Sequence, residues 1–200
     1  MTMTISAQDV KKLRDMTGAG MMDCKKALTE TDGDMEKAID FLRARGAAKA
    51  AKRAEKAANQ GAIGSYVHFD GKTAVMVEVN CETDFVANTD DFKALAKDLA
   101  LHIASAAPLA VSPQDIPADV VERERHVFEE QVREEGKPEA IAAKIVEGKM
   151  QKFFKENTLL AQPFVKDPDK TIEQLVTEVV GKTGEKIEIA RFARFKVGER

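Results

Sequence analysis

The pattern of apolar residues changes its period along the chain. Over residues 5–45 apolar side chains recur every three or four positions, the spacing of amphipathic helices. Ser6 followed by Asp9 has the form of a capping box at the start of the first helix, and glycine turns separate it from a second and a third. The apolar positions behind this prediction are Val10, Leu13, Met16, Met21, Met22, Cys24, Ala27, Leu28, Met35, Ala38, Ile39 and Leu42. We therefore expect a three-helix module close to the lower size limit for independent folding.

Residues 46–60 have a different composition, with much Ala and Lys and hardly any large apolar side chain. Ala, Lys, Arg and Glu favour helix without offering a face for a core, so we predict a helical linker. Solvation explains its basic bias most simply, and contact with an acidic partner or with RNA is the alternative. The basic residues are Lys49, Lys52, Arg53 and Lys56. The predicted domains are thus a helical module at 1–45, the linker, and a larger core at 61–200.

After residue 61 the apolar pattern alternates with a period of two, which is typical of strands. Asp70-Gly71 is a strong signal for a tight hairpin between the first two strands. One face of the first strand is expected to carry Ile63, Ser65, Val67 and Phe69. The matching face of the second strand is expected to carry Val75, Val77, Val79 and Cys81. A last strand over Lys186–Val197 would complete a three-stranded antiparallel sheet.

Helical patterns fill most of the remaining chain. The first begins at Asn88–Asp91 and continues with an apolar stripe. Its stripe consists of Phe92, Leu95, Leu99 and Ile103. Further helices are predicted over 118–135, 138–156 and Thr171–Gly181, with a loop at Gln162–Lys170. Helices covering one face of the sheet give an α+β fold.

Charge and composition exclude several classes of protein. The net charge is −3, whereas nucleic-acid binders usually carry a basic surplus, so we expect no direct nucleic-acid partner. The start of the chain lacks the features of a signal peptide, and no run of 18 apolar residues could span a membrane. Two cysteines indicate a reduced compartment and no disulfide framework. We therefore expect a cytoplasmic protein.

Residues able to carry catalysis or bind a metal are scattered. His68, His102 and His126 are isolated, and the two cysteines are far apart, so no metal site is predicted. Cys24 and Cys81 fall on apolar faces, where we expect buried small hydrophobes. The glycines near residue 18 lack the Lys-Ser/Thr of a phosphate-binding loop. The sequence thus predicts neither an enzyme nor a bound cofactor.

The segment 81–88, CETDFVAN, joins the end of a buried strand to a helix, where loops often carry function. Phe85 and Val86 stand where small polar turn residues are usual. Phe85 could cover the edge of the core, or it could protrude as an aromatic anchor for a partner. Periodicity does not separate these two interpretations.

Four stretches resemble the elongation factor Ts family and occur in its order. LRDMTGAGMMDCKKAL at Leu13–Leu28 is similar to the N-terminal signature, and EVNCETDFVAN at Glu78–Asn88 to the second. AQPFV at Ala161–Val165 resembles a third, and KPEAIAAKIVEGKMQKFF at Lys137–Phe154 is also similar to family sequence. The resemblance covers nearly the whole chain.

The resemblance implies a guanine-nucleotide exchange factor that promotes release of GDP from the GTPase elongation factor Tu. The N-terminal helices would form a ubiquitin-associated-like module that contacts the GTPase domain. A turn in the core would insert near the switch region and disturb magnesium coordination. Adjacent helical residues point about 100° apart, so at least one of Met21 and Met22 is expected in the core. The implied partner-binding residues are Thr83, Asp84, Phe85, Val86, Leu13, Met21 and Met22.

The chain has one strand-hairpin unit and resembles the short form of the family, in which two chains pair. We therefore expect a homodimer and a 2:2 complex with elongation factor Tu, with exposed sheet edges as the physical motive. Two other hypotheses remain. A ubiquitin-associated-like adaptor would leave residues 78–88 without a role. An RNA-binding protein using the basic linker conflicts with the acidic balance and the lack of stacking aromatics.

Overall fold

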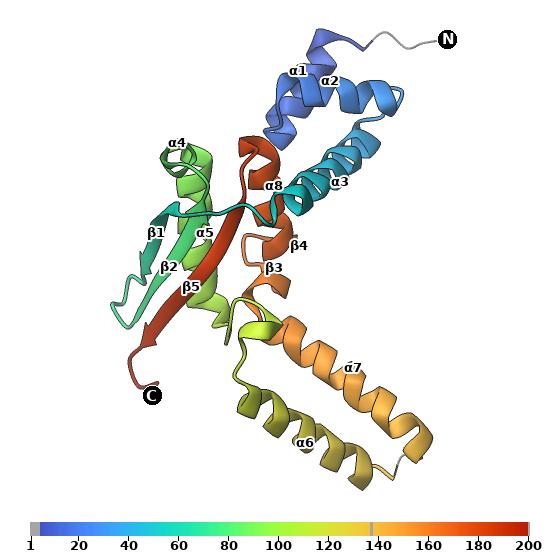
Figure 1. The fold of residues 1–200 in the computed structure, drawn as a ribbon, viewed down its shortest axis with the longest axis vertical. Helices are drawn as coiled ribbons and strands as arrows, with labels where there is room; N and C mark the ends of the chain where they lie inside the picture. Colours follow the sequence, from blue (N-terminus) through green and yellow to red (C-terminus); the bar gives the residue numbers. More distant parts are fainter. Residues whose placement is uncertain (1–4, 137, 200) are drawn as a thin grey trace. The chain divides into compact units, whose positions relative to one another are not determined.

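The computed structural model describes residues 5–136 and 138–199 (Figure 1). The fold is α+β, as predicted, with N-terminal helices followed by an antiparallel three-stranded sheet and further helices. Two compact units are each assembled from several segments. Of the described residues, the first unit contains 5–62, 79–95 and 174–188, and the second contains 63–78, 96–136, 138–173 and 189–199. The division of the chain at residues 45 and 60 stays a prediction.

Three helices open the first unit: α1 (Ala7–Thr17), α2 (Met21–Glu30) and α3 (Met35–Arg53). Ser6 caps α1 as predicted, because its Oγ accepts the backbone N–H of Asp9 at 3.1 Å. The core of these helices contains Val10, Leu13, Cys24, Ala27, Leu28 and Ala38. Met16 is 57% exposed and lies outside this core, because a spacing of three drifts around a helix of 3.6 residues per turn.

Helix α3 is longer than predicted and continues through the first half of the expected linker. Lys49 and Arg53 do not serve as free solvated charges, since Lys49 pairs with Asp23 at 3.0 Å and Arg53 pairs with Glu82 at 2.8 Å. Gly46 is buried, and a Cβ placed there would lie 3.5 Å from the backbone oxygen of Thr177 in α8. This part of the chain is therefore a packed helix of the first unit.

The main sheet has the order β1-β2-β5, with β1 at Gln60–Val67, β2 at Thr73–Cys81 and β5 at Ile187–Lys196. Alternate residues of β2 are buried as predicted. The prediction that Ile63 and Val67 share the sheet face on which the valines of β2 are buried was wrong: they are 56% and 66% exposed, and Gly64 faces inward. A Cβ at Gly64 would come within 2.2 Å of the backbone oxygen of Ala96 in α5, so only glycine permits this approach.

The other long helices occur where the pattern placed them, and the four-residue helix α4 (Asp84–Ala87) lies in the segment predicted as a junction. The long helices are α5 (Asp90–Ala106), α6 (Ala118–Glu134), α7 (Glu139–Asn157) and α8 (Ile172–Thr183). Helices α6 and α7 pack around Val132, Val146 and Met150. The predicted loop at 162–170 instead contains a small antiparallel hairpin of β3 (Pro163–Phe164) and β4 (Asp167–Thr171). None of the described helices is long and apolar enough to cross a membrane.

His102 of α5 is fully buried in the second unit and holds the segment before this hairpin. Its Nε2 lies 3.0 Å from Oε1 of Gln162, and its Nδ1 accepts the backbone N–H of Val165 at 3.3 Å. Nδ1 must be unprotonated to accept that bond, so Nε2–H donates to Gln162. Burial lowers the pKa of His102, which favours this neutral form.

Candidate partner-binding site

The turn after β2 exposes two side chains and buries the two that follow them. Thr83 is the N-cap of the four-residue helix α4, and Val86 and Ala87 at its end are buried. Asp84 is exposed, and Phe85 is 82% exposed. Phe85 therefore does not cover the edge of the core, and the interpretation as a protruding residue agrees with the structure.

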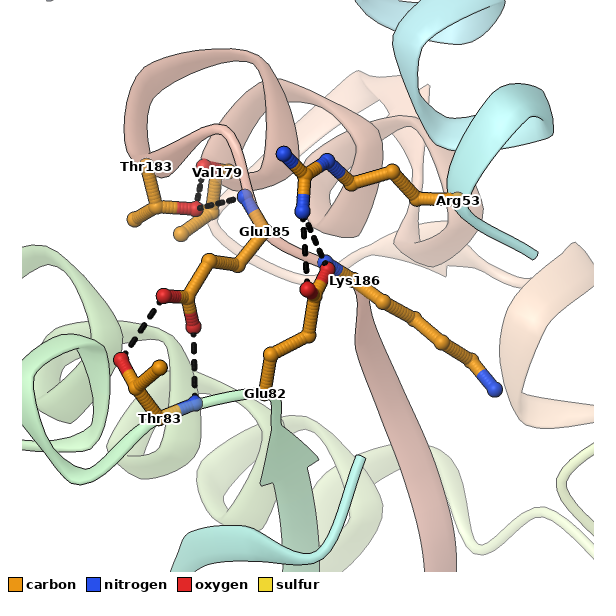
Figure 2. Close-up of polar contacts among 7 residues, drawn as sticks. All are labelled: Arg53, Glu82, Thr83, Val179, Thr183, Glu185 and Lys186. Atoms are coloured by element: carbon orange, nitrogen blue, oxygen red, sulfur yellow. Dashed lines mark hydrogen bonds and ion pairs between the residues drawn. The ribbon is translucent and has the colours of Figure 1, made fainter. Parts of the chain in front are cut away.

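Two glutamates join this turn to the turn between α8 and β5 (Figure 2). Glu185, in the turn between α8 and β5, accepts the Thr83 hydroxyl through Oε1 at 2.7 Å and the Thr83 backbone N–H through Oε2 at 3.0 Å. Glu82 accepts the backbone N–H of Lys186 at 2.7 Å and pairs with Nη1 of Arg53, which lies 2.8 Å from each carboxylate oxygen. Each segment thus supplies a carboxylate to the backbone of the other.

The electrostatics of Glu82 agree with this geometry. The Lys186 N–H and, after it, the Arg53 guanidinium lower the pKa of Glu82, because both favour its charged form. The carboxylate is therefore ionised at neutral pH. Glu185 is in turn fixed through its backbone, whose N–H lies 3.5 Å from the Thr183 hydroxyl.

The two cysteines are buried and free, as predicted. Cys81 donates through Sγ to the backbone oxygen of Thr83 at 3.1 Å, so it also contacts the turn. Burial, followed by the nearby Glu185 carboxylate, raises the pKa of the Cys81 thiol, and burial also raises that of Cys24. Neither thiol is activated as a nucleophile. Among the residues that the structure describes, no cluster of His, Cys, Asp or Glu could hold a metal ion.

A second exposed apolar group lies at the start of α2. Met21 is 49% exposed and Met22 is 74% exposed, so the expectation that at least one of them is core was wrong. They occupy the first turn of the helix, whereas the buried face begins at Cys24. Leu13 is fully buried, so this conformation offers no surface for the direct partner contact expected there. Val86 is also buried, and the Thr83 hydroxyl is engaged by Glu185.

Sequence patterns identified the exposed turn but did not identify the residues that fix its conformation. Glu185 and Arg53 lie 102 and 29 positions from their partners Thr83 and Glu82. No local motif links residues at such separations, and both read as ordinary surface charges in a chain that is 32% charged. Their role emerges only when the fold brings the ends of β2, α3 and α8 together within the first unit.

An exposed Phe on a braced turn and two exposed methionines are typical of a protein that contacts another macromolecule. The sequence comparisons agree with this class. The family Elongation factor TS matches residues 4–199. The chain therefore belongs to the elongation factor Ts family, and its role lies in translation elongation.

Individual relatives match over nearly their full length. The elongation factor Ts of Desulfosudis oleivorans is 58% identical over 196 residues, which is 98% of this chain and 99% of the relative. The protein of the same name from Geobacter sulfurreducens is 54% identical over 197 residues, covering 98% and 91%. That from Thermoanaerobacter sp. is 54% identical over 195 residues, covering 98% and 96%. The chain thus has about the length of these relatives.

Proposed function

We propose that this chain is a guanine-nucleotide exchange factor that promotes release of GDP and Mg²⁺ from elongation factor Tu. Family membership and the 82% exposed Phe85 support the proposal, and the exposed Phe is the observation that carries it. In this account Asp84 and Phe85 insert beside the nucleotide site of the GTPase. The chain acts through binding and performs no covalent chemistry, and it works in the cytoplasm, where translation takes place.

The physical basis is an antagonism between the two ligands of the GTPase. If the exchange factor weakens GDP binding, linkage requires that GDP weakens binding of the factor by the same ratio. Each tenfold change of affinity requires about 1.4 kcal/mol. A buried aromatic anchor contributes about 2–4 kcal/mol to an interface, so Phe85 would supply a useful part of the antagonism. Loss of magnesium contacts to the phosphates would supply the rest.

The methionines of α2 have a separate role in this proposal. Met21 and Met22 are exposed and flexible, which suits an adaptable contact with the GTPase domain. Leu13 and Val86 are buried, so we propose that they support the contacting elements from below. Thr83 caps the turn that carries Asp84 and Phe85.

Release of a fluorescent GDP from elongation factor Tu tests the proposal. The rate is measured with excess unlabelled nucleotide, with and without the chain, over a series of chain concentrations. We expect the rate to rise with concentration and to reach a plateau. A rate that does not change at any concentration would reject nucleotide exchange and would leave the adaptor hypothesis.

We further propose that two copies of the chain pair through the open face of the main sheet. In the second unit, Gly64 faces α5 and Arg194 donates to the backbone oxygen of Ala104, so one sheet face is covered by α5. The opposite face carries apolar residues that are 56–68% exposed, which favours contact with another apolar surface. We name it the open sheet face: Ile63, Val67, Met76 and Phe195.

Light scattering tests this pairing. One chain has a mass of 21.9 kDa, and a dimer would have twice that mass. We expect the dimer mass at micromolar concentration and the monomer mass for Val67→Glu, because a charge on the open sheet face would be buried without a partner. Ala143→Glu on an exposed position of α7 is the matched control and should stay dimeric. A measured wild-type mass near that of one chain would reject the proposed dimer.

A further inference from the structure

We propose that Glu185 is a positioning residue for exchange: it fixes the turn at residues 83–87 so that Phe85 is held outward before a partner binds. This inference rests on the proposed function. The sequence motif at residues 81–88 explains which side chains the turn exposes to a partner. They do not explain what keeps the turn in one conformation.

Phe85 itself cannot fix the turn, because a side chain that is 82% exposed has few contacts to hold it. Helix α4 has only four residues, and so short a helix is unstable without external support. Val86 and Ala87 anchor the end of the turn in the core. Its beginning at Thr83 is only half-buried and depends on polar contacts.

Glu185 provides those contacts at the residue that starts the helix. Its carboxylate accepts both the hydroxyl and the backbone N–H of Thr83, and bonds to an ionised acceptor are stronger than neutral ones. Because the hydroxyl hydrogen points at Glu185, the lone pairs of Thr83 Oγ1 are left for the N–H of Val86, 3.4 Å away. Glu185 thus orients the hydroxyl that caps α4.

The position of Glu185 is itself secured by the residues next to it. Lys186 donates its backbone N–H to Glu82, the residue before Thr83. The two bonds are reciprocal, since each segment gives a side-chain carboxylate and receives one at its backbone (Figure 2). Arg53 pairs with both carboxylate oxygens of Glu82 and so includes the end of α3 in the same arrangement. A group that is ordered in advance loses less entropy when it binds.

The test compares Glu185→Ala with Glu188→Ala, which removes a neighbouring β5 carboxylate that pairs with Nζ of Lys186. The first readout is amide hydrogen exchange of residues 83–88 in the free chain. We expect Glu185→Ala to speed exchange of these amides about tenfold or more, without a comparable change in the core of α5, and we expect Glu188→Ala to leave them unchanged.

The second readout is the plateau rate of GDP release from elongation factor Tu. We expect Glu185→Ala to lower it about tenfold, and to lower it less than twofold when Phe85 is already alanine, because positioning has no effect once the positioned side chain is absent. If Glu185→Ala does not fold, Thr83→Val removes the hydroxyl bond to Glu185 together with the cap bond to Val86 and should lower the plateau several-fold, and Thr83→Ser, which keeps both, should restore it.

A Glu185→Ala plateau within twofold of the wild type would overturn the inference, as would an undiminished effect in the Phe85→Ala background. A wild-type chain that does not accelerate GDP release would instead reject the proposed function. In that case hydrogen exchange decides by itself whether Glu185 orders the turn.

Discussion

Two exposed apolar groups of the first unit, Phe85 and the methionines of α2, are presented in opposite ways. Phe85 projects from a turn whose cap, Thr83, is held by Glu185 through two hydrogen bonds. Met22 lies in the first turn of α2, where Gly20 is the N-cap and no side chain makes a capping hydrogen bond. A phenyl ring has two rotatable side-chain bonds, whereas a methionine has three and adapts to irregular surfaces.

This difference indicates a division of labour. A rigid aromatic side chain in a fixed position is suited to displacing groups in a partner's site, because it keeps its conformation and loses little entropy on binding. Flexible methionines at an uncapped helix start are suited to increasing the affinity for the partner, because their side chains adapt to the shape of its surface. We therefore expect substitutions at the turn to change the maximal exchange rate and substitutions at α2 to change the concentration required.

The largest effect is expected from Phe85→Ala. Loss of an anchor worth about 2–4 kcal/mol lowers the plateau rate of GDP release by about 30-fold or more. Phe69→Ala is the matched control, since Phe69 is 93% exposed and lies outside the turn, and it should leave the plateau unchanged. A plateau reduced equally by both substitutions would show that the position of Phe85 has no special role.

The double substitution Met21→Ala and Met22→Ala should raise the half-maximal concentration about tenfold, equivalent to about 1.4 kcal/mol of binding, and keep the plateau. Met16→Ala, at an exposed methionine of α1, should change neither quantity. The measurement is the same concentration series. If the double variant lowered the plateau as Phe85→Ala does, the two regions would share one role.

Sequence reasoning identified the architecture well because most of it depends on local patterns. The period of three to four, the Ser6 cap and the turn signal at Asp70-Gly71 are local, and the corresponding elements formed, although the loop between Val67 and Thr73 is longer than the tight hairpin predicted there. The face of β1 was assigned wrongly because the close approach of α5 at Gly64 is tertiary and leaves no trace in alternation. Exposure of Phe85 and the role of Glu185 likewise depend on contacts between distant segments.

A smaller effect, on stability, is expected at His102, outside both regions. Burial lowers its folded-state pKa below the usual value near 6.5, so as the pH falls below that value the unfolded chain takes up a proton more readily. Its contribution is therefore present above about pH 6.5 and is lost as the pH falls toward the folded pKa, by about 1.4 kcal/mol for each unit between the two pKa values.

Urea denaturation at pH 7.5 and 5.5 measures this loss. His102→Gln should weaken the dependence on pH, although it also removes hydrogen bonds to Gln162 and Val165. His126→Gln, at an exposed position of α6, should retain the wild-type dependence. If the His102 variant lost as much stability between pH 7.5 and 5.5 as the wild type, the loss would be due to other titrating groups.

The smallest effect is expected at Gly46, which tests whether α3 is a continuous packed helix. A Cβ there has ordinary contact distances, so Gly46→Ala should stabilise the chain by about 0.5–1 kcal/mol through helix propensity. Gly18→Ala should destabilise it, because Gly18 has φ 66° and a Cβ would lie 2.5 Å from Cε of Lys182. Thermal unfolding distinguishes the two signs. Destabilisation by Gly46→Ala would contradict the contact distances between α3 and α8 at this position.

The antagonism between this chain and GDP is tested most directly by calorimetric binding to nucleotide-free elongation factor Tu and to its GDP–Mg²⁺ complex. We predict that the chain binds the nucleotide-free form at least about tenfold more tightly, and that Phe85→Ala reduces this ratio. Equal affinity for the two forms, or a ratio that Phe85→Ala leaves unchanged, would contradict the account.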